Sequence, residues 1–430
     1  MDPRDGRGLD RREFAKAAVA IGGASALSAC LDRLPGGREI PTGGDPSSLP
    51  DRQHAWSERI PNDDHGNDVM PRHHVLLYLD YAGDGTPTAN ERETVETALQ
   101  SLERAYEHSN DGLLFTVGYS PSYFDRFEDS LPEAVDLPAP EPLSSFEDPA
   151  FDEQDVLVHL ASDHGDVVLE AESALLGERD AANDREMDAD LVGVLEKADR
   201  RTGFIGNGLP TEHHADEDVD GIPDDADIDE ESPLFMGFKS GFTKNQATED
   251  RVTIQTGPFE GATTQHVSKI RLRLDDWYGE QDRDDRVAEM FCPAHAENDV
   301  VEGVGENLGD GTNVNECPAD LDETAQEYGR VGHNQKTANA RDDDDNPIIL
   351  RRDFDSTDGG EAGLHFLAVQ REIGDFVETR EAMNGTDATE NPAIRQRVNN
   401  GILEYTFVRR RGNFLLPPRR HRALPTPRPE

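Results

Sequence analysis

Apolar residues along the chain recur with two periods, one typical of helices and one typical of strands. After Thr88, five apolar residues recur every three or four positions, which predicts a helix with one buried face. These residues are Val95, Ala98, Leu99, Leu102 and Tyr106. Short apolar runs predict strands over residues 73–79, 113–119 and 155–161, and a second helix is predicted over 166–176. The first half of the chain therefore follows the order β-α-β, loop, β-α.

The same order recurs in the second half. Ile270, Leu272 and Leu274 alternate with charged neighbours, which predicts a strand within 263–274, and a helical segment follows near 277–290. Strands over 347–350, 364–369 and 403–416 and a helix over 371–383 complete this half. Since consecutive strands usually pair, each half predicts an antiparallel sheet with helices on one face. We therefore expect an α+β fold with two ferredoxin-like domains.

Composition and periodicity together divide the chain into five parts. Residues 1–30 read as an export signal, and residues 31–70, rich in Pro, Gly, Ser and Asp, predict a flexible acidic linker. The N-terminal ferredoxin-like domain is predicted over 71–235, including an acidic loop, and the C-terminal one over 236–417. Residues 418–430 are rich in Pro and Arg and predict a mobile tail.

The first thirty residues resemble a twin-arginine signal followed by a lipobox. Arg11 and Arg12 precede an apolar segment over 17–26 that is too short to span a bilayer permanently. Leu27 to Cys30 has the lipobox pattern, so we expect a lipid anchor at Cys30 and a lipoprotein on the extracytoplasmic face of the membrane. The alternative is a chance arginine pair ahead of an alanine-rich helix.

The chain is strongly acidic. Asp and Glu number 90 against 42 Lys and Arg, which gives a net charge of -48, and only six of the bases are lysines. Such a charge with 34% hydrophobic residues is typical of disorder, but the clear periodicities argue against disorder here. We expect adaptation to molar salt, where self-repulsion is screened, and hence a halophilic, haloarchaeal source. The charge also excludes nucleic acid as a partner.

The two remaining cysteines and one aspartate-rich loop each allow more than one interpretation. Cys292 and Cys317 are compatible with one disulfide or with two unpaired thiols, and their spacing predicts no metal site. An aspartate pattern resembles the calcium loop of thrombospondin repeats or EF-hands, although aspartate runs in an acidic chain are usually solvated surface. The candidate Ca²⁺ ligands are Asp216, Asp218, Asp220, Asp224 and Asp227, with Gly221 at the turn.

The stretch from 329 to 371 carries the strongest chemistry. His333 precedes an apolar run that ends in Arg351 and Arg352. A nitrogen ligand and a fixed cation on neighbouring elements of one sheet are what a haem pocket requires on its two faces. Taken alone, His333 reads rather as an exposed histidine in a polar loop, and Arg351 and Arg352 as solvated charges at a strand end. His365, on an apolar run, is more often a core histidine than a second ligand.

Three segments, in order, resemble the dye-decolourising (DyP-type) peroxidase family. They are residues 113–125, 155–160 and 257–277. The family has two ferredoxin-like domains and binds haem mainly in the second, so the resemblance implies haem b, hydrogen peroxide and a small organic or metal electron donor. Position by position, His333 corresponds to the axial haem ligand and Arg351 to the distal arginine, with Arg352 as the register alternative. A homo-oligomer is compatible with the sequence.

One element departs from the family pattern. Where the family has an aspartate in a Gly-x-x-Asp-Gly motif, residues 237–241 place Ser240, with Asn245 further on, and the alternative turn over 203–208 offers only Asn207. Neither side chain is an acid near neutral pH. Lys239 reads either as a contact for a haem propionate or as a surface lysine. A non-catalytic haem-binding or structural surface lipoprotein is therefore the alternative to a peroxidase, and release of iron from haem is a third reading.

Overall fold

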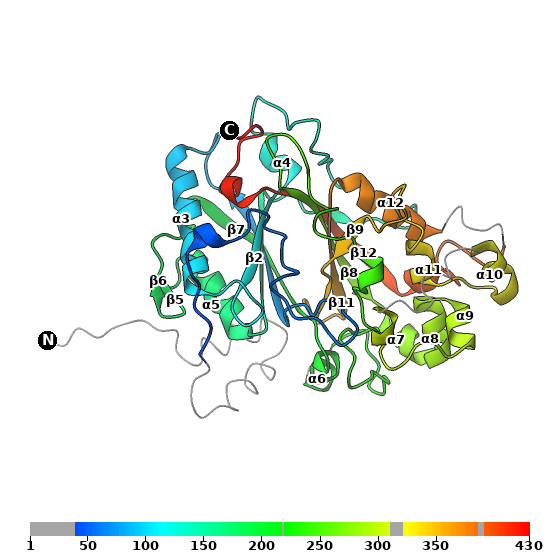
Figure 1. Ribbon diagram of the computed structural model, residues 1–430. Coiled ribbons are helices and arrows are strands. Elements are labelled where there is room, and N and C mark those ends of the chain that lie inside the picture. Colours follow the sequence, from blue (N-terminus) through cyan, green and yellow to red (C-terminus); the bar gives the residue numbers. More distant parts are fainter. Residues whose placement is uncertain (1–38, 217–218, 310–320, 386–390) are drawn as a thin grey trace.

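The structure is a computed structural model that describes residues 39–216, 219–309, 321–385 and 391–430. Within this part of the chain, ten strands form one sheet in the order β10-β7-β1-β4-β2-β12-β8-β11-β9, with β3 paired to β12. The sheet closes on itself, because β10 pairs with both β7 and β11. Figure 1 shows the strands at the centre, with α3 and α5 beside the first half and α7 to α12 around the second.

The first half is a ferredoxin-like unit. Its strands lie in the order β7-β1-β4-β2, and each pair is antiparallel. Thr88 caps α3 in a capping box with Glu91, as its position before the apolar repeat predicts. The elements are β1 (His73–Tyr81), α3 (Ala89–Ala105), β2 (Leu114–Tyr119), β4 (Val156–Ser162), α5 (Gly165–Leu175) and β7 (Leu195–Phe204).

The second half repeats this topology. Strand β8 lies between β12 and β11, and β9 and β10 both pair with β11. A helical insertion separates β8 from β9 and carries His333 at the start of its last helix. The main elements are β8 (Thr263–Leu272), α7 (Leu274–Gly279), α8 (Arg283–Met290), α9 (Pro293–Glu297), α10 (Leu321–Tyr328), α11 (His333–Thr337), β9 (Ile349–Arg351), β10 (Phe354–Ser356), β11 (Gly363–Gln370), α12 (Ile373–Asn384) and β12 (Thr406–Leu416). The short elements are η1 (Pro46–Ser48), α4 (Pro121–Phe124), β3 (Ala150–Phe151), β5 (Ala181–Ala182), β6 (Arg185–Glu186), α6 (Leu209–Asp216), η2 (Thr243–Asn245), η3 (Glu306–Gly309), η5 (Gly401–Glu404) and η6 (Arg419–His421).

The predicted α+β fold with two ferredoxin-like units is confirmed, but the two sheets join into a barrel-like whole. Strand β2 meets β12 at Tyr119 and Leu415, and β7 meets β10 at Phe204 and Asp355. A core cluster inside this closed sheet contains apolar residues from both halves, including Leu76. At these two junctions the edge strands of the halves cover one another, which removes edges that would invite aggregation.

Two segments differ from the sequence prediction. Residues 39–70 are not a flexible linker: Trp56 is fully buried, and the Gln53 amide donates to the carbonyls of Val117 and Pro417. Residues 418–430 are not a mobile tail, since Arg422 and Leu424 are buried. Both segments are polar on average, yet a few buried anchors fix them to the sheet, and averaged composition does not reveal such anchors.

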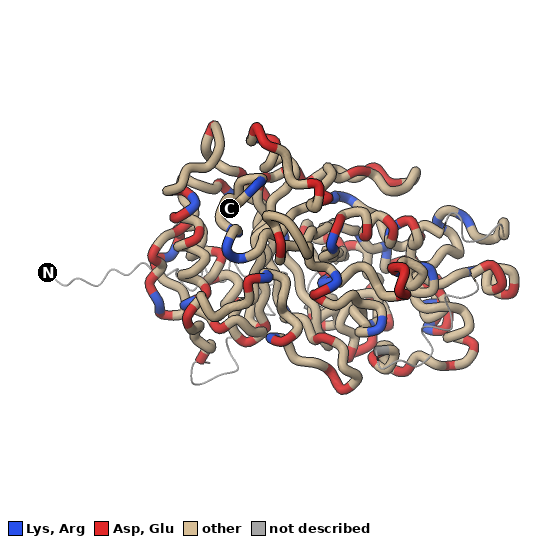
Figure 2. Tube along the Cα trace, turned by 45° about the horizontal axis from the view of Figure 1, so that its top comes forward, with Lys and Arg blue, Asp and Glu red and all other residues tan. Residues whose placement is uncertain are grey.

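The charged residues are distributed over the whole molecule. Figure 2 shows Asp and Glu recurring on most loops and helices, with Lys and Arg lying among them. Among the described residues, no helix is long and apolar enough to cross a membrane. The export signal, the lipobox and Cys30 lie outside the described residues. The distribution of acidic groups is compatible with the predicted molar-salt environment.

Candidate functional site

A cavity of about 450 Å³, the inner cavity, lies in the second half of the molecule. Strands β8, β9, β11 and β12 form one wall, helices α11 and α12 form another, and residues 234–245 close it. Apolar side chains supply much of its lining, including Met236, Phe238, Ile270, Phe366 and Ile402. Apolar cavities with a few polar groups are the usual form of cofactor sites.

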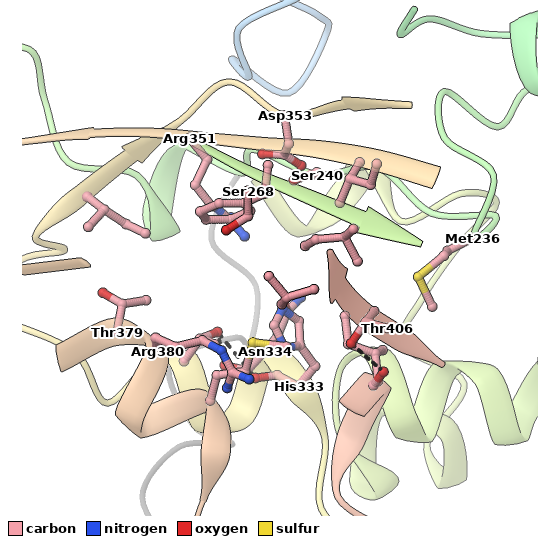
Figure 3. A pocket seen from close by; sticks show the side chains of 18 of the residues that line it. Met236, Ser240, Ser268, His333, Asn334, Arg351, Asp353, Thr379, Arg380 and Thr406 are labelled. Atoms are coloured by element: carbon pink, nitrogen blue, oxygen red, sulfur yellow. Dashed lines mark hydrogen bonds between the residues drawn. The ribbon is translucent and has the colours of Figure 1, made fainter. Parts of the chain in front are cut away.

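His333 stands at one side of the inner cavity. It is the first residue of α11, and Gln335 accepts a hydrogen bond from the backbone N–H of Gly332, which fixes the start of this helix. The His333 Nδ1 atom is buried without a hydrogen-bond partner, while the ring borders the cavity and is partly exposed to it (Figure 3). Burial, reinforced by the positive charge of Lys336, lowers the pKa of His333 well below its usual range. The imidazole is therefore neutral, as a metal-binding histidine must be.

Arg351 stands at the other side of the same cavity. Figure 3 shows Arg351, Asp353, Ser240 and Ser268 along one side and His333 on the opposite side. The Arg351 backbone is held by Gln246, whose amide accepts from the Arg351 N–H at 3.0 Å and donates to its carbonyl at 3.2 Å. The Arg351 guanidinium forms no ion pair with any of the described residues. A cation thus faces the cavity without a neutralising carboxylate.

Strand alternation separates the two arginines. Arg352 points to the opposite face, where its Nη2 donates to the His54 carbonyl at 2.6 Å and its guanidinium lies 4.2 Å from the Trp56 ring centroid. Arg352 is 5% exposed and does not line the inner cavity. The structure therefore brings Arg351, and not the register alternative, together with His333.

The predicted substitutes for the missing acid occupy different places. Ser240 lines the inner cavity on the side of Arg351, whereas Asn207 is exposed and does not line it. Lys239 also lines the cavity, but its Nζ lies 3.3 Å from a carboxylate oxygen of Asp63. Ser240 thus belongs to the site and Asn207 does not.

Sequence reasoning missed two carboxyl groups in this cavity, Asp353 and Asp355. Asp353 is 8% exposed, and Asp355 is 1% exposed. The Phe235 N–H donates to the Asp355 carboxyl, yet burial raises the pKa of Asp355 well above its usual range, and the charge of Asp353 adds to this shift. The spacing in the sequence could have identified them. In an extended chain, residues two and four positions after Arg351, which are Asp353 and Asp355, lie on the same face as Arg351.

A second, larger cavity adjoins the first. This outer cavity measures about 1010 Å³ and is lined mostly by polar and charged residues, including Arg72, Asp163 and Asn207. Lys239, Ser240, Arg351 and Asp353 line both cavities. These four residues therefore stand between the polar outer cavity and the apolar inner one.

The remaining candidates lie away from this site. His365 is fully buried, with its Nε2 3.4 Å from Asp358, so it is placed as a core histidine. Cys292 is disulfide-bonded, and its partner lies outside the described residues, as does Cys317.

The predicted calcium loop gains no support. Among the described residues, no group of three or more His, Cys, Asp or Glu side chains is arranged to hold a metal ion. Asp218 lies outside the described residues. Asp220 instead forms a short backbone pairing with Glu361, and Asp224 and Asp227 show no common ligand geometry.

Solved structures with a similar fold are DyP-type proteins. A dye-decolorizing protein from V. cholerae shares 16% identity, with 85% of this chain and 98% of that chain covered and a TM-score of 0.52. A DypB variant from Rhodococcus jostii RHA1 in complex with heme shares 16% identity, with 86% and 97% covered and a TM-score of 0.52. A putative DyP-type peroxidase from Shewanella oneidensis shares 16%, with 82% and 94% covered and a TM-score of 0.51. At this identity the likeness shows the fold.

The sequence itself points to a family without an assigned role. No curated protein matches the chain. Residues 71–418, which include both ferredoxin-like units and the inner cavity, match the family described as "Family of unknown function (DUF7405)". With most of its length matched, the chain belongs to this family of unknown function, DUF7405.

Proposed function

We propose that this protein is a haem-dependent peroxidase of the DyP type, which reduces hydrogen peroxide with electrons from an organic or metal donor. The observation that carries the proposal is the placement of His333 and Arg351 at opposite sides of one largely apolar cavity. A neutral imidazole on one face and a fixed cation on the other are the two groups that a haem peroxidase requires. The DyP-type fold, and a heme complex among the similar structures, support the same assignment.

The residues present fit haem b. His333, whose Nδ1 has no hydrogen-bond partner, would hold the haem iron, and the apolar lining would accommodate the macrocycle. Arg409 lines the cavity, is exposed and forms no ion pair with the described residues, so it suits a propionate. Haem, when bound, would supply the iron-centred redox chemistry.

The protein's own groups would act on the peroxide. The Arg351 guanidinium would stabilise negative charge that develops on oxygen as the O–O bond breaks, and Gln246 fixes the backbone that carries it. The Ser240 hydroxyl can donate or accept a hydrogen bond at the same place. Phe238 and Phe366 would keep bulk water from the reacting atoms.

We also propose that the protein is exported by the twin-arginine route and anchored by a lipid at Cys30 on the extracytoplasmic face of the membrane. The signal and lipobox patterns of residues 1–30 support this location. The excess of 90 acidic over 42 basic residues supports a halophilic environment, so the assays below are best run in molar KCl.

Peroxide-dependent dye oxidation by haem-loaded protein tests the proposed function. Arg351→Ala should retain haem but lose about 100-fold or more in turnover, because one preorganised charge-stabilising group typically contributes that much. Arg371→Ala is the matched control, since Arg371 is exposed and lies outside both cavities. Equal turnover of Arg351→Ala and wild type would contradict the proposed role.

One observation favours a second candidate function. Ser240 stands where the DyP-type pattern has an aspartate, which suits a non-catalytic haem-binding lipoprotein. Haem uptake by the wild-type protein without any peroxide turnover would support this candidate over the peroxidase.

A further inference from the structure

We propose that Asp353 supplies the carboxylate that transfers a proton between the two oxygens of hydrogen peroxide. This inference rests on the proposed function and names the acid–base group that the Ser240 motif lacks. Asp353 follows Arg351 by two positions, in the short link between β9 and β10. Both line the inner cavity, and Figure 3 shows them on the side opposite His333.

The carboxylate of Asp353 has no protein partner among the described residues and borders the cavities. Asp353 is 8% exposed, and it forms no ion pair or side-chain hydrogen bond with the residues that the structure describes. Buried carboxylates that serve the fold are satisfied: Asp152, 1% exposed, accepts from Arg201 at 2.6 and 2.8 Å and from Arg410 at 2.6 Å. Asp353 has no such partner, and since it lines both cavities its carboxylate is available to a small molecule there, as a catalytic carboxylate must be.

Asp353 also stands where peroxide would pass. It lines both the polar outer cavity and the apolar inner cavity, together with Arg351 and Ser240. A small polar molecule that moves from the outer to the inner cavity therefore meets this carboxylate beside the Arg351 guanidinium. A general base must lie within hydrogen-bond reach of the proton that it accepts, so a carboxylate that lines both cavities with Arg351 is the candidate for peroxide.

The proposed step balances. The Asp353 carboxylate accepts a proton from one peroxide oxygen and donates it to the other, the O–O bond breaks, and the protonated oxygen leaves as water. Over the whole reaction the organic or metal donor supplies two electrons, solvent supplies two protons, and the second peroxide oxygen also leaves as water; haem, when bound, would relay the electrons. Asp353 ends in its starting state, so the carboxylate acts catalytically.

Substitution of the carboxylate by its amide tests the proposal. In haem-loaded protein without donor, Asp353→Asn should slow the reaction with peroxide by about 100-fold. Asp343→Asn, on an exposed position between His333 and Arg351 and outside both cavities, removes the same charge and should react at the wild-type rate. Adding Ser240→Asp to Asp353→Asn places a carboxylate on the same side of the cavity and should restore much of the rate.

Cyanide association supplies a readout that is independent of turnover. Hydrogen cyanide must lose a proton to bind as cyanide, so a nearby base accelerates its association. Asp353→Asn should lower the association rate by about tenfold or more, with the control variant unchanged. The haem absorption spectrum and the melting temperature of each variant establish that haem and fold are retained.

The outcomes separate the two claims. Wild-type rates of peroxide reaction and cyanide association in a folded, haem-loaded Asp353→Asn variant would overturn the role of Asp353 and leave the proposed function intact. If the wild type binds haem but does not turn over peroxide, the proposed peroxidase fails, and cyanide association alone decides whether Asp353 is the cavity base. If Asp353→Asn does not fold, Asp353→Glu replaces it, and a cyanide rate equal to wild type is then required.

Discussion

Replacement of Lys336 by methionine tests what holds the His333 helix in place. Lys336 is 1% exposed, and its Nζ donates to the Met383 carbonyl at 2.6 Å, the Asn400 carbonyl at 2.9 Å and the Asn400 Oδ1 at 2.6 Å. One ammonium group therefore ties α11 to the end of α12 and to the segment before Gly401.

The magnitude follows from two opposing terms. Hydrogen bonds to a charged group contribute about 1.5–3 kcal/mol each, and Lys336 makes three of them. Burial, reinforced by the charge of Arg380, lowers the pKa of Lys336 to about 7, and the methionine variant no longer bears this cost of a buried charge. We therefore expect Lys336→Met to lower the free energy of unfolding by about 2–4 kcal/mol, because three buried acceptors lose their donor.

Urea unfolding in molar KCl measures this loss through the transition midpoint. Lys197→Met is the matched control, because the Lys197 side chain is 42% exposed and its Nζ lies 4.0 Å from Glu172. The control should change the unfolding free energy by less than about 0.5 kcal/mol. Haem affinity should fall in Lys336→Met alone, since the same ammonium positions the helix that begins at His333. Equal midpoints for Lys336→Met and wild type would refute this reasoning.

Three further predictions concern the frame around the site. Gly401→Ala should lower the free energy of unfolding by about 1–3 kcal/mol, since Gly401 has φ +61° and an added Cβ would lie 2.8 Å from the backbone nitrogen of His333. An unchanged melting temperature would contradict this packing. Arg422→Met should lower the free energy of unfolding by about 3–5 kcal/mol and expose the C-terminus to protease, because the buried Glu103 loses one of its cationic partners. Protease resistance equal to that of the wild type would contradict the anchoring role. Stability should also fall as the pH decreases from about 6.5 toward 4, because burial lowers the pKa of ten of the described histidines, including the four below, and the unfolded chain then binds more protons. The pKa values are about 3 for His54, His73 and His74 and about 4 for His108. Each contributes about 1.4 kcal/mol per pH unit, and His74→Phe should reduce the slope by one such contribution, whereas a flat profile of unfolding free energy against pH would exclude the effect.

The pattern of apolar residues predicted most of the fold. The helix after Thr88 and the strands over 73–79, 113–119 and 155–161 are close to α3, β1, β2 and β4. Strand β7 was not predicted, because much of it, from Glu196 to Arg200, is charged and half-exposed or exposed. Its pairing partners, β1 and β10, fix it instead, and single-sequence periodicity carries no information on such pairing.

Only part of the candidate site was predictable from the sequence, because the rest of it depends on tertiary packing. His333, Arg351 and Ser240 were identified from the sequence, and the structure places all three on one cavity. Asp353 follows Arg351 by two positions, but it lies after the end of β9, so strand alternation alone does not place it in the cavity. Asn207 was excluded by its exposure, which depends on tertiary packing. Local spacing thus nominates residues, while the folded chain decides which of them meet.

The absorption spectrum of haem-titrated protein in molar KCl tests the central claim most directly. Wild-type protein should bind one haem per chain and develop a Soret band, and His333→Ala should lose the band of the axially ligated haem while keeping its far-ultraviolet circular dichroism. Asp343→Asn should match the wild type in both measurements. A Soret band of the same position and intensity in folded His333→Ala would contradict the assignment of His333 as the ligand in the inner cavity.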